Sequence, residues 1–189
     1  GWVAPENLKG RIVLKNLFGT PAENRRVVAE LSLEPARPFF RKYSEFEFAI
    51  PTEGHPGGYS EPLPNQMTDS NGETTFDFNL ERFSKGMYTL SFEAEGFEAN
   101  GGRAVSANAS TLISTNEYLV GLKSTDSLNF IPKGSVRKVS VIAINSNLET
   151  TAVSDIEATI FERRYVSTLM RQSDGTYSYQ SVRKETSRE

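Results

Sequence analysis

Short runs of alternating apolar and polar residues, each closed by Gly, Pro, Asn or Asp, fill the chain from Leu8 to Val182. Successive side chains of a β-strand point to opposite faces, so this two-residue period indicates strands with one buried face. No stretch with the 3.6-residue period of a helix interrupts the runs with comparable strength. The pattern predicts an all-β protein built from antiparallel β-sandwiches.

The length of the chain suits two sandwiches rather than one. With 189 residues, it can form two immunoglobulin-like domains that each bury a modest core. Twelve Phe and seven Tyr make it too aromatic for a disordered protein. We expect the first domain at residues 1–114 and the second at residues 115–189, because the runs before Ser114 already supply the strands that one sandwich needs.

The first block carries six candidate strands, which are expected at residues 9–17, 26–34, 43–50, 74–80, 86–94 and 101–113. Residues 51–66 are rich in Pro and Gly and are expected to form a loop. The sequence Asp69-Ser70-Asn71-Gly72 has the residue types of a tight turn, which would lead into the strand at 74–80. On that strand Phe76, Phe78 and Leu80 share one face, which we expect to be buried.

The second block carries about four candidate strands, at residues 118–123, 136–144, 156–164 and 176–182, with a hairpin turn at Asp174-Gly175. Four strands are too few to close a sandwich. The second domain is therefore expected either to be cut off at Glu189 or to be completed by another chain. The chain also begins at Gly1-Trp2 without an initiator Met, so we expect it to be a piece of a longer protein.

Composition excludes several classes of function. The net charge is −3 and the basic residues are scattered, which argues against a nucleic-acid partner. No apolar run approaches the ~20 residues that span a bilayer, so we expect no direct membrane insertion. The chain has no cysteine and one histidine, which leaves no nucleophile, base and orienting group for catalysis. We expect no enzymatic activity, no cofactor and no metal.

Individual candidates for catalytic or metal sites also favour structural interpretations. His55 has no second His or Cys to share a metal ion with. Glu45 and Glu47 share one strand face but have no pocket to raise the pKa of a general acid, so a solvated face is favoured over a glycosidase pair. The Asp69 turn lacks the later ligands of a calcium loop.

Two surface patterns are weighed in the same way. Asn108-Ala109-Ser110 fits the glycosylation sequon, but so short a pattern arises often by chance. The aromatic pairs Phe46/Phe48 and Phe76/Phe78 alternate with polar neighbours, as residues that point into a core do. They are therefore interpreted as core rather than as a carbohydrate-binding platform.

Several sequence motifs, in their order along the chain, resemble one family. These are NLFGTPAENRRV from Asn16 to Val27, the turn Asp69–Gly72 before residues 74–80, the Gly-x-Tyr-x-Leu at Gly86–Leu90, and the second block from Ser127 to Glu185. Together they are similar to the macroglobulin-like domains of bacterial alpha-2-macroglobulins. The likeness covers nearly the whole chain, and its second block resembles the start of the bait-bearing domain of that family.

The resemblance implies a function. Proteins of this family are built from serial sandwich domains, and a protease that cuts an exposed bait segment is trapped by the rearrangement that follows. It implies a structural segment of a broad-range protease inhibitor in the periplasm, with target proteases and neighbouring macroglobulin-like domains as partners. Many members also capture the protease through a Cys-x-x-Gln thioester, which this chain cannot form because it has no cysteine.

The same resemblance places a bait segment at or just beyond Glu189. The tail Ser181–Glu189 carries Arg183, Lys184 and Arg188, which trypsin-like proteases recognise, and it has no apolar residue after Val182. We therefore expect this tail to approach a protease-sensitive segment, although any polar chain end is mobile and cleavable. The main alternative function is a spacer or adhesive immunoglobulin-like module of a bacterial surface protein. A carbohydrate-binding or hydrolytic sandwich is a third alternative.

Overall fold

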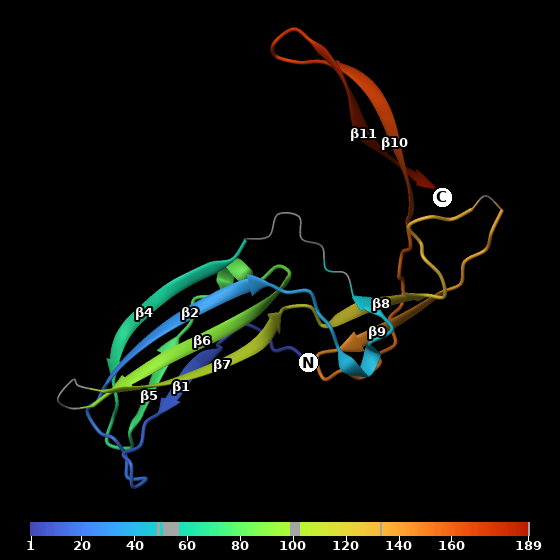
Figure 1. The fold of residues 1–189 in the computed structure, drawn as a ribbon. Coiled ribbons are helices and arrows are strands. Elements are labelled where there is room, and N and C mark those ends of the chain that lie inside the picture. Colours follow the sequence, from blue (N-terminus) through green and yellow to red (C-terminus); the bar gives the residue numbers. More distant parts are fainter. Residues whose placement is uncertain (49, 51–56, 99–102, 133, 189) are drawn as a thin grey trace. The chain divides into compact units, whose positions relative to one another are not determined.

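The computed structural model describes residues 1–48, 50, 57–98, 103–132 and 134–188. Within these residues the chain is all-β, with eleven strands and two short 3₁₀ helices (Figure 1). The paired strands run antiparallel throughout, so the predicted fold class is confirmed. Contacts divide the chain into two units, Gly1–Ala152 and Val153–Glu189. The domain boundary expected at residue 114 stays a prediction.

The first unit is organised around a four-stranded sheet in the order β4-β2-β6-β7. Its two central strands are β2 (Arg26–Pro35) and β6 (Met87–Phe97), and its edges are β4 (Tyr59–Met67) and β7 (Ala104–Ser114). The β2–β6 register runs from Val27 opposite Gly96 to Pro35 opposite Tyr88. Both central strands show the alternating burial that the sequence predicted for them.

A ribbon of two strands, β1 (Lys9–Val13) and β5 (Glu73–Asp77), packs against the buried face of this sheet (Figure 1). Phe76 of β5 is 2% exposed, and its ring centroid lies 5.6 Å from that of Phe92 on β6. Gly10 of β1 lies beneath the same aromatic group, where an added Cβ would come within 2.6 Å of the Phe92 ring. Close aromatic packing therefore joins the two layers of the sandwich.

Strand β4 corrects the sequence interpretation, which assigned residues 51–66 to a loop. Residues 59–67 form a strand although they contain Pro62 and Pro64. Proline lacks an N–H donor and is tolerated at sheet edges, and among the described strands β4 pairs with β2 alone. The register shifts between Val27 and Ala29, so the β4 residues between Leu63 and Gln66, including Pro64, form an irregularity. Residues 51–56 lie outside the described part.

The strand predicted at residues 43–50 is also shorter than expected. Arg41–Tyr43 form a 3₁₀ helix, η1, and among the described residues of this range Glu47–Phe48 form a strand, β3. Phe46 and Phe48 nevertheless face inward as predicted, because Phe48 is buried and Phe46 packs against the same cluster. The described register of β3 with β8 consists of Glu47 opposite Leu122 and Phe48 opposite Gly121.

Strand β3 belongs to a three-stranded sheet with β8 (Tyr118–Ser124) and β9 (Val139–Asn145). This sheet covers a second hydrophobic cluster, whose buried members are Trp2, Phe40, Phe48, Met87, Leu119 and Ile144. Trp2 also donates its indole N–H to the Asn116 carbonyl at 2.9 Å. The cluster therefore ties the start of the chain to the connection between β7 and β8.

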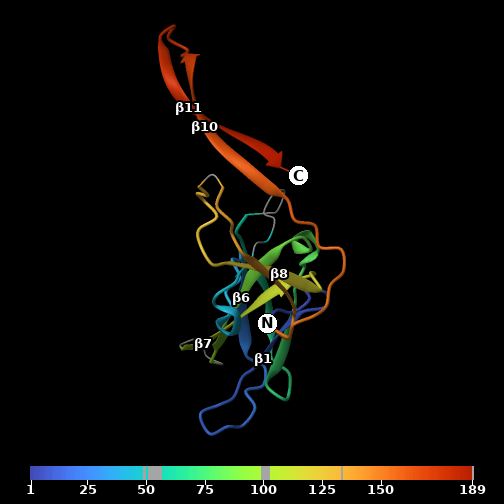
Figure 2. The same ribbon diagram turned by 90° about the vertical axis from the view of Figure 1, so that its right-hand side faces the viewer.

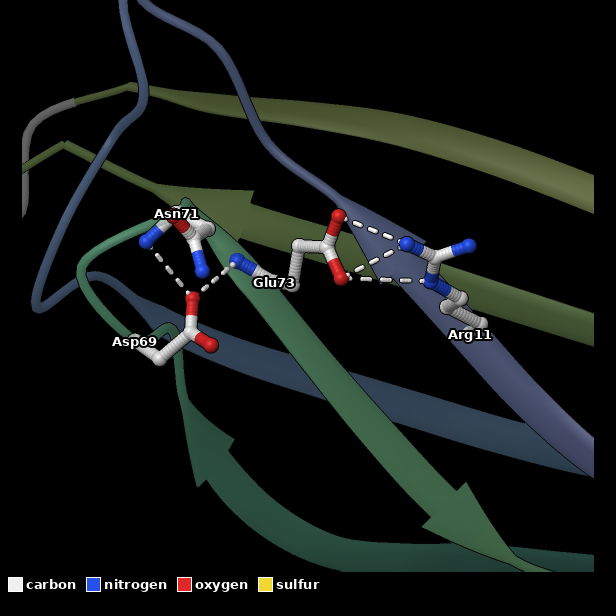
Figure 3. A network of polar contacts seen from close by, with 4 residues as sticks. All are labelled: Arg11, Asp69, Asn71 and Glu73. Atoms are coloured by element: carbon white, nitrogen blue, oxygen red, sulfur yellow. Dashed lines mark hydrogen bonds and ion pairs between the residues drawn. The ribbon is translucent and has the colours of Figure 1, made fainter.

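The turn from Asp69 to Gly72 forms as the sequence predicted (Figure 3). The Asp69 carboxylate accepts hydrogen bonds from the amides of Asn71 at 2.8 Å and Glu73 at 2.9 Å. Gly72 has φ of +73°, which favours glycine. Glu73 then forms a bidentate pair with Arg11, which joins β5 to β1 at the exposed surface. A second 3₁₀ helix, η2 (Glu81–Phe83), follows β5.

The second unit consists mainly of one long hairpin, β10 (Ile160–Arg171) and β11 (Tyr177–Arg188). The two strands pair from Ile160 opposite Arg188 to Arg171 opposite Tyr177, and they form the twisted ribbon seen in Figures 1 and 2. The predicted turn at Asp174-Gly175 connects them, and Gly175 has φ of +87°. Strand β10 begins at Ile160 rather than at residue 156, and both strands continue beyond the ends that the sequence indicated, to Arg171 and Arg188.

The core of the first unit predicts unequal effects for two neighbouring phenylalanines. Phe76→Ala should lower the free energy of unfolding by about 3–5 kcal/mol, because a fully buried ring leaves a cavity. Phe78 lies beyond β5 and is only partly buried, although its ring centroid is 5.3 Å from that of Phe92. Phe78→Ala should therefore cost less. Urea titration measures both, with Thr75→Ala on the exposed face as control; equal losses would contradict the difference in burial between the two rings.

Candidate functional site

The three basic residues proposed near a cleavage segment all lie on β11. Arg183 is opposite Tyr165, Lys184 is opposite Arg164, and Arg188 forms the last pair with Ile160. The sequence indicated that the strand would end at Val182, because no apolar residue follows it. Instead, backbone pairing with β10 continues to Arg188. The tail is therefore a strand of the hairpin, and the absence of apolar residues did not end it.

An ion pair connects the two strands near the same end, and another lies within β11. The Arg163 Nε lies 2.8 Å from the Glu185 Oε1, and the Arg183 Nη2 lies 3.1 Å from the same oxygen. These side chains are partly exposed, and pairs of this kind contribute little to stability. Arg164 lies directly opposite Lys184, but its Nε also pairs with the Glu162 Oε1 of the same strand at 2.5 Å, which offsets the repulsion between the two like charges. The charges hold this end of the hairpin only weakly.

Large apolar side chains remain exposed along the hairpin. Tyr165, Leu169, Tyr177 and Tyr179 share one face and are each more than half exposed. A two-stranded hairpin on its own is marginally stable in water, because it has no second layer in which to bury such a face. Pairing along β10 and β11 therefore depends mainly on backbone hydrogen bonds and the turn.

The turn of the hairpin is well defined. The Asp174 Oδ1 accepts hydrogen bonds from the Thr176 amide at 2.9 Å and from the Thr176 hydroxyl at 2.7 Å. These two bonds, the hydroxyl first, hold the pKa of the Asp174 carboxyl below its ordinary value. The Gln172 amide also donates to the Thr176 carbonyl at 2.7 Å, which closes the loop.

The other candidates lie apart from this hairpin. Glu45 and Glu47 are both exposed, and the Glu45 carboxylate pairs with the Lys123 ammonium at 2.7 Å. Asn108 lies on β7 opposite Glu93. His55 falls outside the described residues. In the described ranges no three His, Cys, Asp or Glu residues come close enough together to hold a metal ion.

The described ranges also contain no helix with the length and apolar composition needed to cross a bilayer.

Comparison with known protein families finds a match to part of the first unit. The model of the bacterial alpha-2-macroglobulin MG5 domain matches residues 4–114. The chain belongs to the bacterial alpha-2-macroglobulin family. This confirms the resemblance drawn from the sequence motifs, and the match includes both the Asn16–Val27 motif and the Asp69–Gly72 turn.

Relatives in the alpha-2-macroglobulin family extend the likeness beyond the MG5 match. The chain is 38% identical to an alpha-2-macroglobulin homolog of Yersinia pestis over 98% of its own length and 9% of the relative's. It is also 38% identical to the alpha-2-macroglobulin of Pasteurella multocida over 96% of the chain and 10% of that protein. The chain thus spans about a tenth of these relatives.

Solved structures of the family share the fold. The native conformation of E. coli alpha-2-macroglobulin has a TM-score of 0.66 and 16% identity, and covers 100% of the chain and 13% of that protein. E. coli alpha-2-macroglobulin activated by porcine elastase has a TM-score of 0.64 and 18% identity, covering 100% of the chain and 17% of that protein. These likenesses support the macroglobulin-type arrangement of the strands.

The hydrogen bonds of the hairpin turn predict a measurable shift in the pKa of Asp174. We expect Asp174 to titrate below the ordinary range for aspartate, and Thr176→Val to raise its pKa partway back by removing the hydroxyl donor. Because the folded pKa is depressed, the stabilisation of the hairpin is present above the unfolded pKa and is lost as the pH falls through the folded value. Carbon-13 NMR of the Asp174 carboxyl measures the folded-state pKa in the original chain and in the Thr176 variant. Unchanged titration in the Thr176 variant would contradict the geometry.

Proposed function

We propose that the chain is a structural segment of a bacterial alpha-2-macroglobulin-like inhibitor, which traps a range of proteases in the periplasm after they cut a bait segment. The observation that carries this proposal is the match of the MG5 model to residues 4–114. A relative that has the same fold over the whole chain is described as activated by porcine elastase, which supports a protease as the trigger. The chain's own role is to hold and space, not to catalyse.

The partners follow from this role. Target proteases meet the full-length protein, and neighbouring macroglobulin-like domains contact the segment; nucleic acid and the membrane interior are not partners. We further propose that residues 1–114 and 115–189 belong to successive sandwiches, and that residues outside the chain complete the second one. The apolar face of the hairpin supports this completion, since Tyr165, Leu169 and Tyr179 gain burial from another layer.

We also place the bait segment at or just beyond the C-terminal end of β11. A protease binds its substrate as an extended, unpaired strand, so a bond within β11 becomes accessible only when that end opens. Two features favour opening there: the hairpin has two strands in the described part of the chain, and Arg188 occupies the last register pair. Of the basic residues in the tail, Arg188 therefore unpairs first, and Arg183 last.

Limited proteolysis of the full-length protein tests this placement. Trypsin should cut first at or shortly after residues 181–189 and produce a more compact, faster-migrating form on a native gel. Arg183→Gln, Lys184→Gln and Arg188→Gln combined should move or delay any trypsin cut within the tail, and leave cleavage by elastase unchanged. Mass spectrometry of the products locates the cut.

The matched control is Arg171→Gln, because Arg171 is also a trypsin site and lies at the turn end of the same hairpin. This change should leave the first cut and the compaction unaffected. First cuts in residues 51–66, with no change in migration, would contradict the bait placement and favour the spacer or adhesive module.

A further inference from the structure

The loop between β1 and β2 presents two large apolar side chains at its tip. Leu17 is 95% exposed and Phe18 is 92% exposed, which makes them the two most exposed large hydrophobic residues in the described part of the chain. Single exposed apolar residues are common on protein surfaces, but two adjacent ones of this size at a loop tip are not explained by chance exposure alone. The function of the tip depends on whether the loop holds them in place.

Hydrogen bonds fix the conformation of the tip. The Gly19 amide donates to the Asn16 carbonyl at 2.8 Å, and the Asn16 amide donates to the Thr20 carbonyl at 2.8 Å. The Asn16 side-chain amide also donates to the Thr20 hydroxyl at 3.1 Å and to the Pro21 carbonyl at 3.0 Å. Gly19 has φ of +84°, a conformation that glycine adopts without strain. Leu17 and Phe18 thus occupy the middle of a closed turn.

The base of the loop is anchored to the sandwich. The Leu14 amide donates to the Gly72 carbonyl at 2.7 Å, and the Ala22 amide donates to the Leu14 carbonyl at 3.0 Å. Ala22 is 3% exposed, and its carbonyl accepts a hydrogen bond from the buried Thr68 hydroxyl at 2.6 Å. An added Cβ at Gly72 would lie 2.3 Å from the Leu14 oxygen, so the loop and the Asp69–Gly72 turn fit closely.

A rigid turn that displays two apolar side chains has the properties of a binding anchor. Most of the energy of a protein interface comes from a few large side chains that enter a pocket, and preorganisation reduces the entropy lost on binding. The hydrogen bonds around Asn16 hold the backbone in place before any partner arrives. Leu17 and Phe18 are therefore suited to entering a shaped apolar pocket on a partner.

We propose that the Leu17–Phe18 tip docks into an apolar pocket on another domain of the same, longer polypeptide. About nine-tenths of the length of the curated relatives lies outside the region that the chain matches, so partner domains are available. A lipid surface fits less well, because the loop residues 14–25 carry two basic residues and one acidic residue, and a net charge of +1 attracts anionic headgroups only weakly. The docking does not depend on protease trapping by the parent protein.

Site-specific photo-cross-linking in the full-length protein tests the docking. Phe18 is replaced by the photoreactive residue benzoylphenylalanine, the protein is irradiated, and the linked peptides are identified by mass spectrometry. We expect cross-links from position 18 to one segment of the same molecule outside residues 1–189, several-fold more abundant than links from the same residue placed at Val136, which is 88% exposed. Cross-links within residues 1–189, to a second copy or to added lipid vesicles would overturn the proposal, as would the absence of any cross-link above the Val136 control.

A second variant separates docking from folding. Leu17→Ser combined with Phe18→Ser should leave the thermal midpoint of the 189-residue chain unchanged, because both side chains are already in solvent there. The same pair should lower the midpoint of the transition that contains this domain in the full-length protein. Val136→Ser is the control in both contexts. A shift in the short chain, or none in the full-length protein, would contradict the proposal.

Discussion

The pairing of β2 with β6 is the constraint on which the rest of the first unit depends. Its register, from Val27 opposite Gly96 to Pro35 opposite Tyr88, decides which side chains of both strands face the core. A slip of one residue would exchange the two faces and place Leu31 and Leu33, which have no exposed surface, in solvent. Strand β4 then adds to β2, and β7 adds to β6.

The central pair also positions the more distant parts of the unit. Strand β7 follows β6 to Ser114 opposite Met87, and Ile113 next to this end bridges to Val3 at the start of the chain. Met87 belongs to the cluster that contains Trp2 and lies beneath β3, β8 and β9. The same sheet therefore contributes to both hydrophobic clusters, and this explains why residues 1–152 form one compact unit.

Alternation was the reliable signal in the sequence. It predicted β2 and β6 closely because both are central strands with one buried face. The turns at Asp69–Gly72 and Asp174-Gly175 were predicted separately, from residue types that favour turns. Alternation missed β4, because Pro62 and Pro64 look like loop residues unless the strand is known to lie at an edge. That position is a property of the whole sheet.

The candidate site was less predictable than the fold. Arg183, Lys184 and Arg188 were recognised as cleavable residues, but their pairing with β10 was not, since polar strands leave little hydrophobic pattern. Leu17 was assigned to the end of a strand at residues 9–17, which is wrong because β1 ends at Val13, and no periodicity reveals that the loop tip with Leu17 and Phe18 faces solvent. For the basic residues the missing information was their pairing with residues of β10. For Leu17 and Phe18 it was that the fold leaves both side chains exposed.

The two units thus differ in how they are stabilised: the first contains its own core, and the second is a hairpin that we propose is completed by other parts of the protein. Hydrogen exchange, measured by mass spectrometry on the 189-residue chain and on the full-length protein, tests this difference most directly. We expect β2 and β6 to be equally protected in both, and residues 160–188 to exchange rapidly in the short chain and slowly in the full-length protein. Protection of residues 160–188 in the short chain as strong as that of β2 and β6 would contradict the account.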